Sequence, residues 1–273
     1  MERLGWWLCA GLAKLGALDS GEPGEAARCS DAADVDPVQM LFGRLLRESR
    51  IAYPLVVDAW QAVGEHLFEE PEDGVSVRYV HGSDRDRWID VYFYPAGVLS
   101  NAQVAEAALA EAELIRQAHL QAGYTEFQLD RLRSFSFTGG DGKAVDGNAL
   151  ELAYTIDGVR YSSAMTLLLD RLYFVKARYS IEESKLSRRD AREQLQAFTA
   201  RLQPRLSITN VGDGAGSWAD SLAGMAFAGM DGSVHDGLGG IAHDMRELRL
   251  EYDTPRADPL PVPEARTAEL SAS

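Results

Sequence analysis

Two His-Asp pairs flank a glycine cluster in the stretch HDGLGGIAHD, residues 235–244. Histidine and aspartate are both zinc ligands, so the spacing decides whether they can hold a metal. If the stretch is helical, His235 and His243 lie about 12 Å apart along the axis, too far for two ligands of one zinc ion. Only a sharp reversal at Gly239 and Gly240 would bring them together. We therefore predict no metal site here, and no bound cofactor anywhere in the chain.

The dipeptide Arg-Tyr occurs three times, beginning at Arg78, Arg160 and Arg178. Neighbouring residues of a strand point to opposite faces, so each tyrosine can pack while each arginine points outward. If those strands adjoin, the three arginines and Lys176 form a basic strip that could bind a carboxylate or phosphate group. The alternative is cross-strand pairing with acidic residues such as Asp90. These four basic residues are the candidate ligand-binding set.

Motifs of familiar enzymes are missing from the sequence, which contains no G-x-S-x-G, H-E-x-x-H or C-x-x-C. The stretch TGGDGKAVDGN (138–148) lacks the glycine spacing and the Ser or Thr of a phosphate loop. It also fails as a calcium loop, because Lys143 and Val145 stand where oxygen ligands are needed. We predict a glycine-rich hairpin loop. The alternative to a non-catalytic protein is a hydrolase with a dispersed site, for which His81, Asp84 and Asp90 are the candidate residues.

The composition is that of a globular protein, with 46% hydrophobic and 25% charged residues in a chain of 273. The formal net charge of −15 disfavours binding to nucleic acid or to anionic lipid surfaces. No run of about 18 apolar residues is present, so we expect no membrane span. The expected partner is an unidentified protein or a small ligand.

The first residues, MERLGWWLCAGLAKLGAL, resemble a secretory signal peptide, with apolar residues from Leu4 to Leu18. Lys14 interrupts the apolar block, and the alternative is a short amphipathic helix of a cytoplasmic protein. Cys9 and Cys29 favour neither a structural disulfide nor a cysteine metal cluster. We expect a periplasmic or secreted protein, and otherwise a cytoplasmic one.

The central region alternates between strand and helix patterns. Residues 74–80 and 87–95 have the two-residue period of strands, and a helix follows from a capping box at Ser100 and Gln103 to Gly123. Further strands are predicted at 124–137, 149–156, 159–169 and 172–181, with a hairpin turn at Asp157-Gly158. Ser187 begins a last helix. The pattern predicts an α+β fold, an antiparallel sheet of about five to six strands packed with two main helices.

The stretches EEPEDGVSVRYVHG, IDVYFYPAG and LYFVKARYSI, before a final helix, resemble small bacterial-type envelope α/β proteins with a PsbP-like sandwich. The resemblance covers roughly residues 50–206. It implies a sandwich fold and a binding or accessory module. It carries over no catalytic residues.

The chain is thus divided into a leader (1–30), a short N-terminal helix (31–49), the sandwich domain (50–206), a glycine- and methionine-rich accessory helical segment (207–250) and a flexible tail (251–273). The accessory segment has an apolar stripe that suits partner contacts. Its candidate interaction residues are Trp218, Leu222, Met225 and Met230. The sequence favours a non-catalytic cell-envelope binding or accessory module that recognises a protein or a small anionic ligand.

Overall fold

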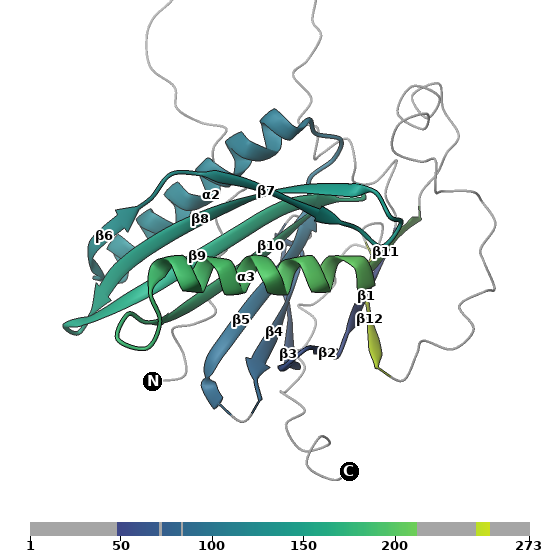
Figure 1. Ribbon diagram of the computed structural model, residues 1–273. Coiled ribbons are helices and arrows are strands. Elements are labelled where there is room, and N and C mark those ends of the chain that lie inside the picture. Colours follow the sequence, from purple (N-terminus) through teal and green to yellow (C-terminus); the bar gives the residue numbers. More distant parts are fainter. Residues whose placement is uncertain (1–47, 71–72, 83, 212–243, 252–273) are drawn as a thin grey trace, which may run out of the picture.

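The computed structural model describes residues 48–70, 73–82, 84–211 and 244–251, which form two antiparallel sheets and two long helices (Figure 1). The larger, nine-stranded sheet runs in the order β2-β3-β4-β5-β10-β9-β8-β6, and β7 also pairs with β8. Its strands are β2 (Val56–Val57), β3 (Trp60–Leu67), β4 (Val75–His81), β5 (Asp84–Pro95), β6 (Thr125–Leu129), β7 (Arg133–Thr138), β8 (Ala144–Ile156), β9 (Val159–Asp170) and β10 (Tyr173–Glu182).

The hairpin between β8 and β9 turns where the sequence predicts. Asp157 and Gly158 both have positive φ, 50° and 79°, as the two central residues of a type I′ turn require. The turn sets the register, so that Ile156 pairs with Val159 and Tyr154 with Tyr161. The glycine-rich stretch near residue 140 is likewise the connection between β7 and β8.

The two helices begin at the predicted caps. In α2 (Asn101–Gln121), the side chain of Ser100 accepts a hydrogen bond from the backbone of Gln103, and the Gln103 side chain completes a capping box. In α3 (Arg188–Leu202), Ser187 caps the first turn, and the short 3-10 helix η3 (Gln203–Arg205) follows. In the part of the chain that the structure describes, neither helix is long and apolar enough to cross a membrane.

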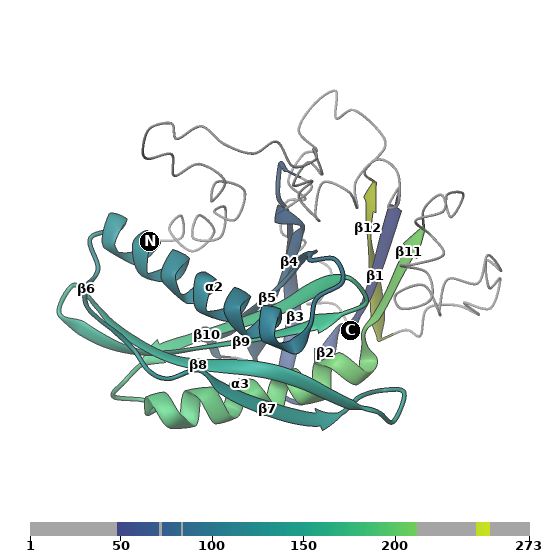
Figure 2. The same ribbon diagram turned by 90° about the horizontal axis from the view of Figure 1, so that it is seen from above.

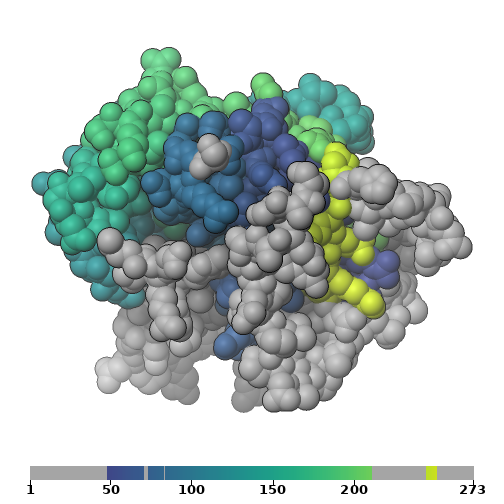
Figure 3. Space-filling view, turned by 90° about the horizontal axis from the view of Figure 1, so that it is seen from below, coloured from purple at the N-terminus to yellow at the C-terminus, as the bar shows by residue number. Residues whose placement is uncertain are grey.

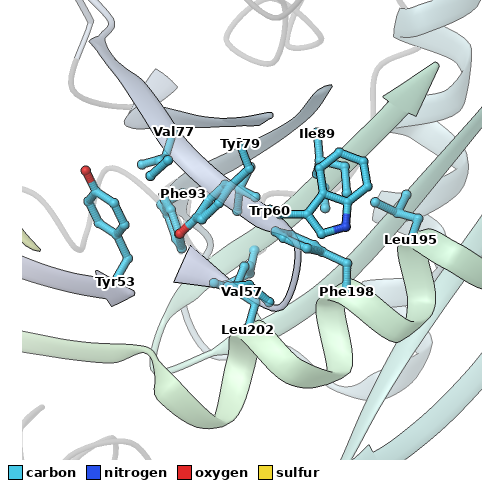
Figure 4. Close-up of a cluster of buried hydrophobic side chains, with 14 of the residues drawn as sticks. Tyr53, Val57, Trp60, Val77, Tyr79, Ile89, Phe93, Leu195, Phe198 and Leu202 are labelled. Atoms are coloured by element: carbon cyan, nitrogen blue, oxygen red, sulfur yellow. The ribbon is translucent and has the colours of Figure 1, made fainter. Parts of the chain in front are cut away.

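The helices cover opposite faces of the large sheet (Figure 2). On the α3 side, the ring of Phe198 packs edge to face against Tyr79, at 5.2 Å between ring centroids, and against Trp60, at 5.9 Å (Figure 4). On the α2 side, Ala108 and Ile115 pack on the even-numbered leucines of β8. Each face therefore has its own apolar core, which produces three layers.

A second, three-stranded sheet has the order β11-β1-β12 and differs from what the sequence predicts. Its strands are β1 (Glu48–Pro54), β11 (Ser207–Val211) and β12 (Met245–Glu251), and β12 lies against β1 (Figure 3). Glu48 and Ser49, expected in a helix, thus begin β1. Met245, expected on a helical stripe, begins β12. Leu248 and Leu250 are buried in the α3-side core, so the end of the accessory segment belongs to the main fold.

The five or six predicted strands were therefore too few. The sequence analysis missed β2 and β3, and it missed β1, β11 and β12, which pair with segments more than 150 residues away in the chain. Such pairing leaves no hairpin turn signal in the sequence. The expected leader and most of the expected N-terminal helix and tail lie outside the described residues.

Gly74 precedes β4 at a point where the backbone of β5 comes very close. Its φ is +67°, and a Cβ built there would lie 1.9 Å from the carbonyl oxygen of Phe93. Glycine alone fits, because it tolerates this φ and has no side chain. Gly64, in β3, is different, since a Cβ there would meet nothing within 4 Å.

Candidate functional site

Three charged side chains form a row across the middle of the large sheet. Asp90 in β5 is the direct cross-strand neighbour of Arg78 in β4 and of Arg178 in β10. Directly opposed residues project from the same face, which here is the α2 side. Arg78 donates two hydrogen bonds to Asp90, of 2.7 and 2.9 Å, and its guanidinium lies 5.2 Å from the ring centre of Trp88. The cross-strand pairing considered from the sequence is thus present at Arg78.

Lys176, two residues before Arg178, projects from the same face but is buried beneath α2. Its ammonium lies 2.8 Å from the carboxylate of Glu111, and both side chains are only 4% exposed. The Tyr94 hydroxyl donates a 2.7 Å hydrogen bond to the other oxygen of Glu111. The rings of Tyr92 and Tyr94 lie 4.8 and 5.2 Å from the ammonium, in cation–π contact. The charge of Lys176 is therefore compensated inside the protein, and it links β10 to α2.

Arg160 lies apart from the other three basic residues. Arg160 lies in β9 an even number of residues from Ala164 and Leu168, which belong to the α3-side core, so its side chain projects from that face of the sheet. Its guanidinium donates to the backbone oxygen of Glu126 at 2.8 Å and lies 3.6 Å from Glu183. A single strip of four basic residues does not form, because Arg160 projects from the opposite face of the sheet to Arg78, Lys176 and Arg178.

A stack of tyrosines lies near the C-terminal end of α2, on the same face as the charged row. Tyr154 and Tyr161, cross-strand partners, stack with centroids 5.6 Å apart and planes 11° apart. Tyr124 covers the other side of Tyr154 at 5.4 Å. His119, in the last turn of α2, meets Tyr154 edge-on at 4.3 Å. Tyr154 and His119 are buried, whereas Tyr124 and Tyr161 are partly exposed.

The charge of Arg178 acts on the stack. Burial, and secondly the charge of Arg178, lower the pKa of His119 to about 3. Burial raises the pKa of Tyr154 and of Tyr124, and the same guanidinium partly opposes both shifts. The Nδ1 atom of His119 is buried and has no hydrogen-bond partner among the described residues. We call Tyr124, Tyr154, Tyr161, His119 and Arg178 together the tyrosine–arginine surface.

Sequence reasoning identified Arg178 but missed the tyrosines as a group. One signal was available, because Tyr154 and Tyr161 lie at equal distances from the predicted Asp157-Gly158 turn and must therefore pair across the hairpin. Tyr124 and His119 join them only through the packing of α2 on β6, β8 and β9. No local pattern in the sequence contains that information.

Of the residues considered for a hydrolase, His81 and Asp84 are cross-strand partners at the β4–β5 hairpin, and Asp90 lies further along β5. His81 ends β4, where it meets the ring of Trp60 edge-on at 4.9 Å. Within the described ranges it makes no hydrogen bond to a carboxylate or hydroxyl, and Asp90 is engaged by Arg78. The same ranges contain no group of three His, Cys, Asp or Glu residues placed to hold a metal ion. Outside them lie His235, His243 and the candidate interaction residues Trp218, Leu222, Met225 and Met230.

Comparisons with known proteins find no matching family model and no matching curated protein. Among solved structures, this chain is similar to LpqN from Mycobacterium tuberculosis, described as involved in cell envelope biogenesis. The identity is 12% over 61% of this chain and 87% of that chain, with a TM-score of 0.37. It is also similar to cyanobacterial PsbP (CyanoP) from Synechocystis, at 11% identity over 68% of this chain and 100% of that chain, with a TM-score of 0.37.

The likeness to a PsbP-like protein that the sequence suggests is therefore present, at low similarity. Because both TM-scores are below 0.5, neither likeness bears on function. The function is inferred below from the residues of this chain.

Proposed function

We propose that this protein is a non-catalytic binding or accessory module of the cell envelope, which recognises a protein or a small anionic ligand at the tyrosine–arginine surface. The observation that carries the proposal is the stack of three tyrosines whose outer rings, Tyr124 and Tyr161, are partly exposed beside Arg178. The envelope location rests on the signal-like apolar block at residues 4–18 of the sequence.

Tyrosine and arginine are the residue types that contribute most to binding at protein interfaces. Tyrosine supplies a large contact area with few rotatable bonds, and both types are enriched among the residues that dominate affinity. In the stack, Tyr154 is buried between the two outer rings, which holds them in place before any partner arrives. Binding therefore loses little side-chain entropy, which favours affinity.

The charge of Arg178 favours an anionic group as part of the recognised partner. Arg178 is half-buried, and its charge reaches His119, Tyr124 and Tyr154 through surroundings where water screens charge less than at an open surface. The lowered pKa of His119 supports this, because the arginine contributes to the shift.

The state of His119 argues against an enzyme at this surface. An efficient general acid or base has a pKa near the operating pH, so that both protonation states are accessible. With a pKa of about 3 and almost no exposure, His119 stays neutral at pH 7. It packs against the stack and does not exchange protons with a bound molecule.

Site-specific photo-cross-linking tests the proposal. A photo-reactive phenylalanine derivative replaces Tyr161 in one variant and Leu109, exposed in the middle of α2, in a matched control. In cells of the source organism, we expect an adduct from position 161 that Arg178→Gln diminishes, and none from position 109.

A second arm uses small anions on the purified full chain. Acetate and inorganic phosphate are titrated while backbone amide shifts are followed by NMR. Shifts confined to residues around Arg178 and Tyr161 support a small anionic ligand. The absence of both an adduct from position 161 and such shifts would refute the proposal.

A further inference from the structure

A cavity of about 580 Å³ opens at the other end of α2, away from the tyrosine–arginine surface. Asn101, Val104 and Ala105 of the first helical turns form one wall, and β7 and β8 form the other. His119 is 18 residues further along the helix, which places it about 27 Å away along the axis. The volume is in the usual range for a small-molecule site, roughly 300 to 1,000 Å³.

The polar lining of the cavity follows from strand register. Ser134 pairs with Asn148, and Ser136 pairs with Asp146, so four polar side chains form a block on one face of β7 and β8. Asp146 accepts a 3.0 Å hydrogen bond from the side-chain amide of Asn101, which ties the helix start to the strand. The polar wall is thus held in place by both the sheet and the helix.

Asn148 is the residue that points to a ligand. Asn148 lines the cavity and is only 7% exposed to solvent. Its Oδ1 accepts a long, 3.5 Å hydrogen bond from Ser134, while its Nδ2 donates to no protein group in the described part of the chain. The amide hydrogens of Asn148 are therefore available to an acceptor on a molecule bound in the cavity.

The composition of the lining decides the class of ligand. Among the described residues no lysine, arginine or histidine lines the cavity, which disfavours an anion. Asp146 is the one carboxylate among the described lining residues, and a single negative charge binds a metal ion only weakly. The hydroxyls of Ser134 and Ser136 and the amide of Asn148 both donate and accept hydrogen bonds. Val104 and Leu169 add apolar surface beside them.

We propose that this cavity binds a neutral carbohydrate of one or two sugar rings. Vicinal hydroxyl groups donate and accept at once, as the serine and asparagine side chains do, and the C–H faces of a sugar ring match the apolar wall. The site is separate from the tyrosine–arginine surface, and it extends the binding function by a second ligand of different chemistry.

Calorimetric titration of the full chain tests the proposal with glucose, mannose and maltose as probes. Glucosamine, a cation at neutral pH, and glucose 6-phosphate, an anion, are the matched charged probes. We expect at least one neutral sugar to bind with millimolar affinity or better. We expect it to bind more tightly than either charged counterpart.

Two variants locate the site. Asn148→Ala removes the amide and should weaken neutral-sugar binding by about tenfold, the value of one or two hydrogen bonds. Ala105→Trp fills the cavity from the helix side without touching the polar block, and should abolish binding even if Asn148→Ala folds poorly. Leu109→Trp, the same substitution one turn further on at an exposed position, is the control and should bind normally.

Asp146→Asn separates sugar from cation binding, because it keeps the shape of the side chain and removes its charge. Neutral-sugar affinity should change by less than about threefold. If the parent protein binds glucosamine more tightly than the neutral sugars, and Asp146→Asn abolishes that preference, the cavity is a cation site and the carbohydrate proposal is wrong. No binding of any neutral sugar, or binding that Ala105→Trp leaves intact, would overturn the proposal.

Discussion

Replacing His119 with leucine should make the protein more resistant to acid. In the folded protein burial and the charge of Arg178 keep the pKa of His119 near 3, whereas an exposed histidine titrates near 6.5. As the pH falls below 6.5, the unfolded chain binds a proton at this position and the folded chain does not. The stability associated with neutral His119 is therefore fully present above pH 6.5 and is lost progressively down to pH 3.

The size of the effect follows from the two pKa values. Between pH 7.5 and 5.5 the unfolded histidine changes from mostly neutral to mostly charged, which lowers the free energy of unfolding by about 1.4 kcal/mol. Over the full range the loss reaches several kcal/mol, a large part of the stability of an ordinary domain. Leucine fits the apolar surroundings of Tyr154 and Phe127 and does not titrate.

Urea denaturation at pH 7.5, 6.5 and 5.5 measures the effect for the parent protein, His119→Leu and the exposed-site control Leu120→Ala. The parent and the control should lose about 1.4 kcal/mol more than His119→Leu between the two end points. Arg178→Gln should show nearly the same loss as the parent over this range, because burial, the larger cause of the shift, by itself keeps folded His119 mostly neutral at pH 5.5. Parallel pH profiles for the parent and His119→Leu would refute the account of this histidine.

The remaining predictions concern stability. In urea denaturation, Gly74→Ala should lower the free energy of unfolding by more than about 2 kcal/mol, and the control Gly64→Ala by less than about 1 kcal/mol. Equal effects of the two substitutions would contradict the close approach of the β5 backbone to Gly74. Lys176→Met should lower the free energy of unfolding by about 3 to 5 kcal/mol, because it leaves the buried charge of Glu111 uncompensated. In a double-mutant cycle, the further substitution Glu111→Leu should restore most of the lost stability. Gly158→Val should cost about 1 to 2 kcal/mol through its positive φ, and an unchanged thermal melt would exclude the type I′ turn.

Elements with a strong local pattern could be predicted from the sequence. Strands β4 and β5 alternate apolar and polar residues, and the turn between β8 and β9 has the residues that its backbone angles require. The helices α2 and α3 begin at the caps that Ser100 and Ser187 indicate. The single strand expected at 124–137 is instead the two strands β6 and β7, both paired with β8.

The site was predictable only in part. Alternation along β10 places Lys176 and Arg178 on one face, whereas Arg78 joins that face only through the register of β4 and β10 with β5. The sequence could not show that Lys176 is buried, because its partner Glu111 is 65 residues away on α2. It likewise could not show the cavity, whose walls come from the start of α2 and from β7 and β8.

The sequence by itself determined the local conformations, since capping, turn chemistry and the period of apolar residues act over a few neighbouring residues. It also determined the acidic charge of the chain and the face of each strand. Only the tertiary structure decided which polar groups lose contact with water and which of them meet. It joined β1 to β12 across nearly 200 residues, and brought His119 and Tyr154 together. Burial and pairing of that kind depend on packing between distant segments, and they set the electrostatics from which the proposed function is inferred.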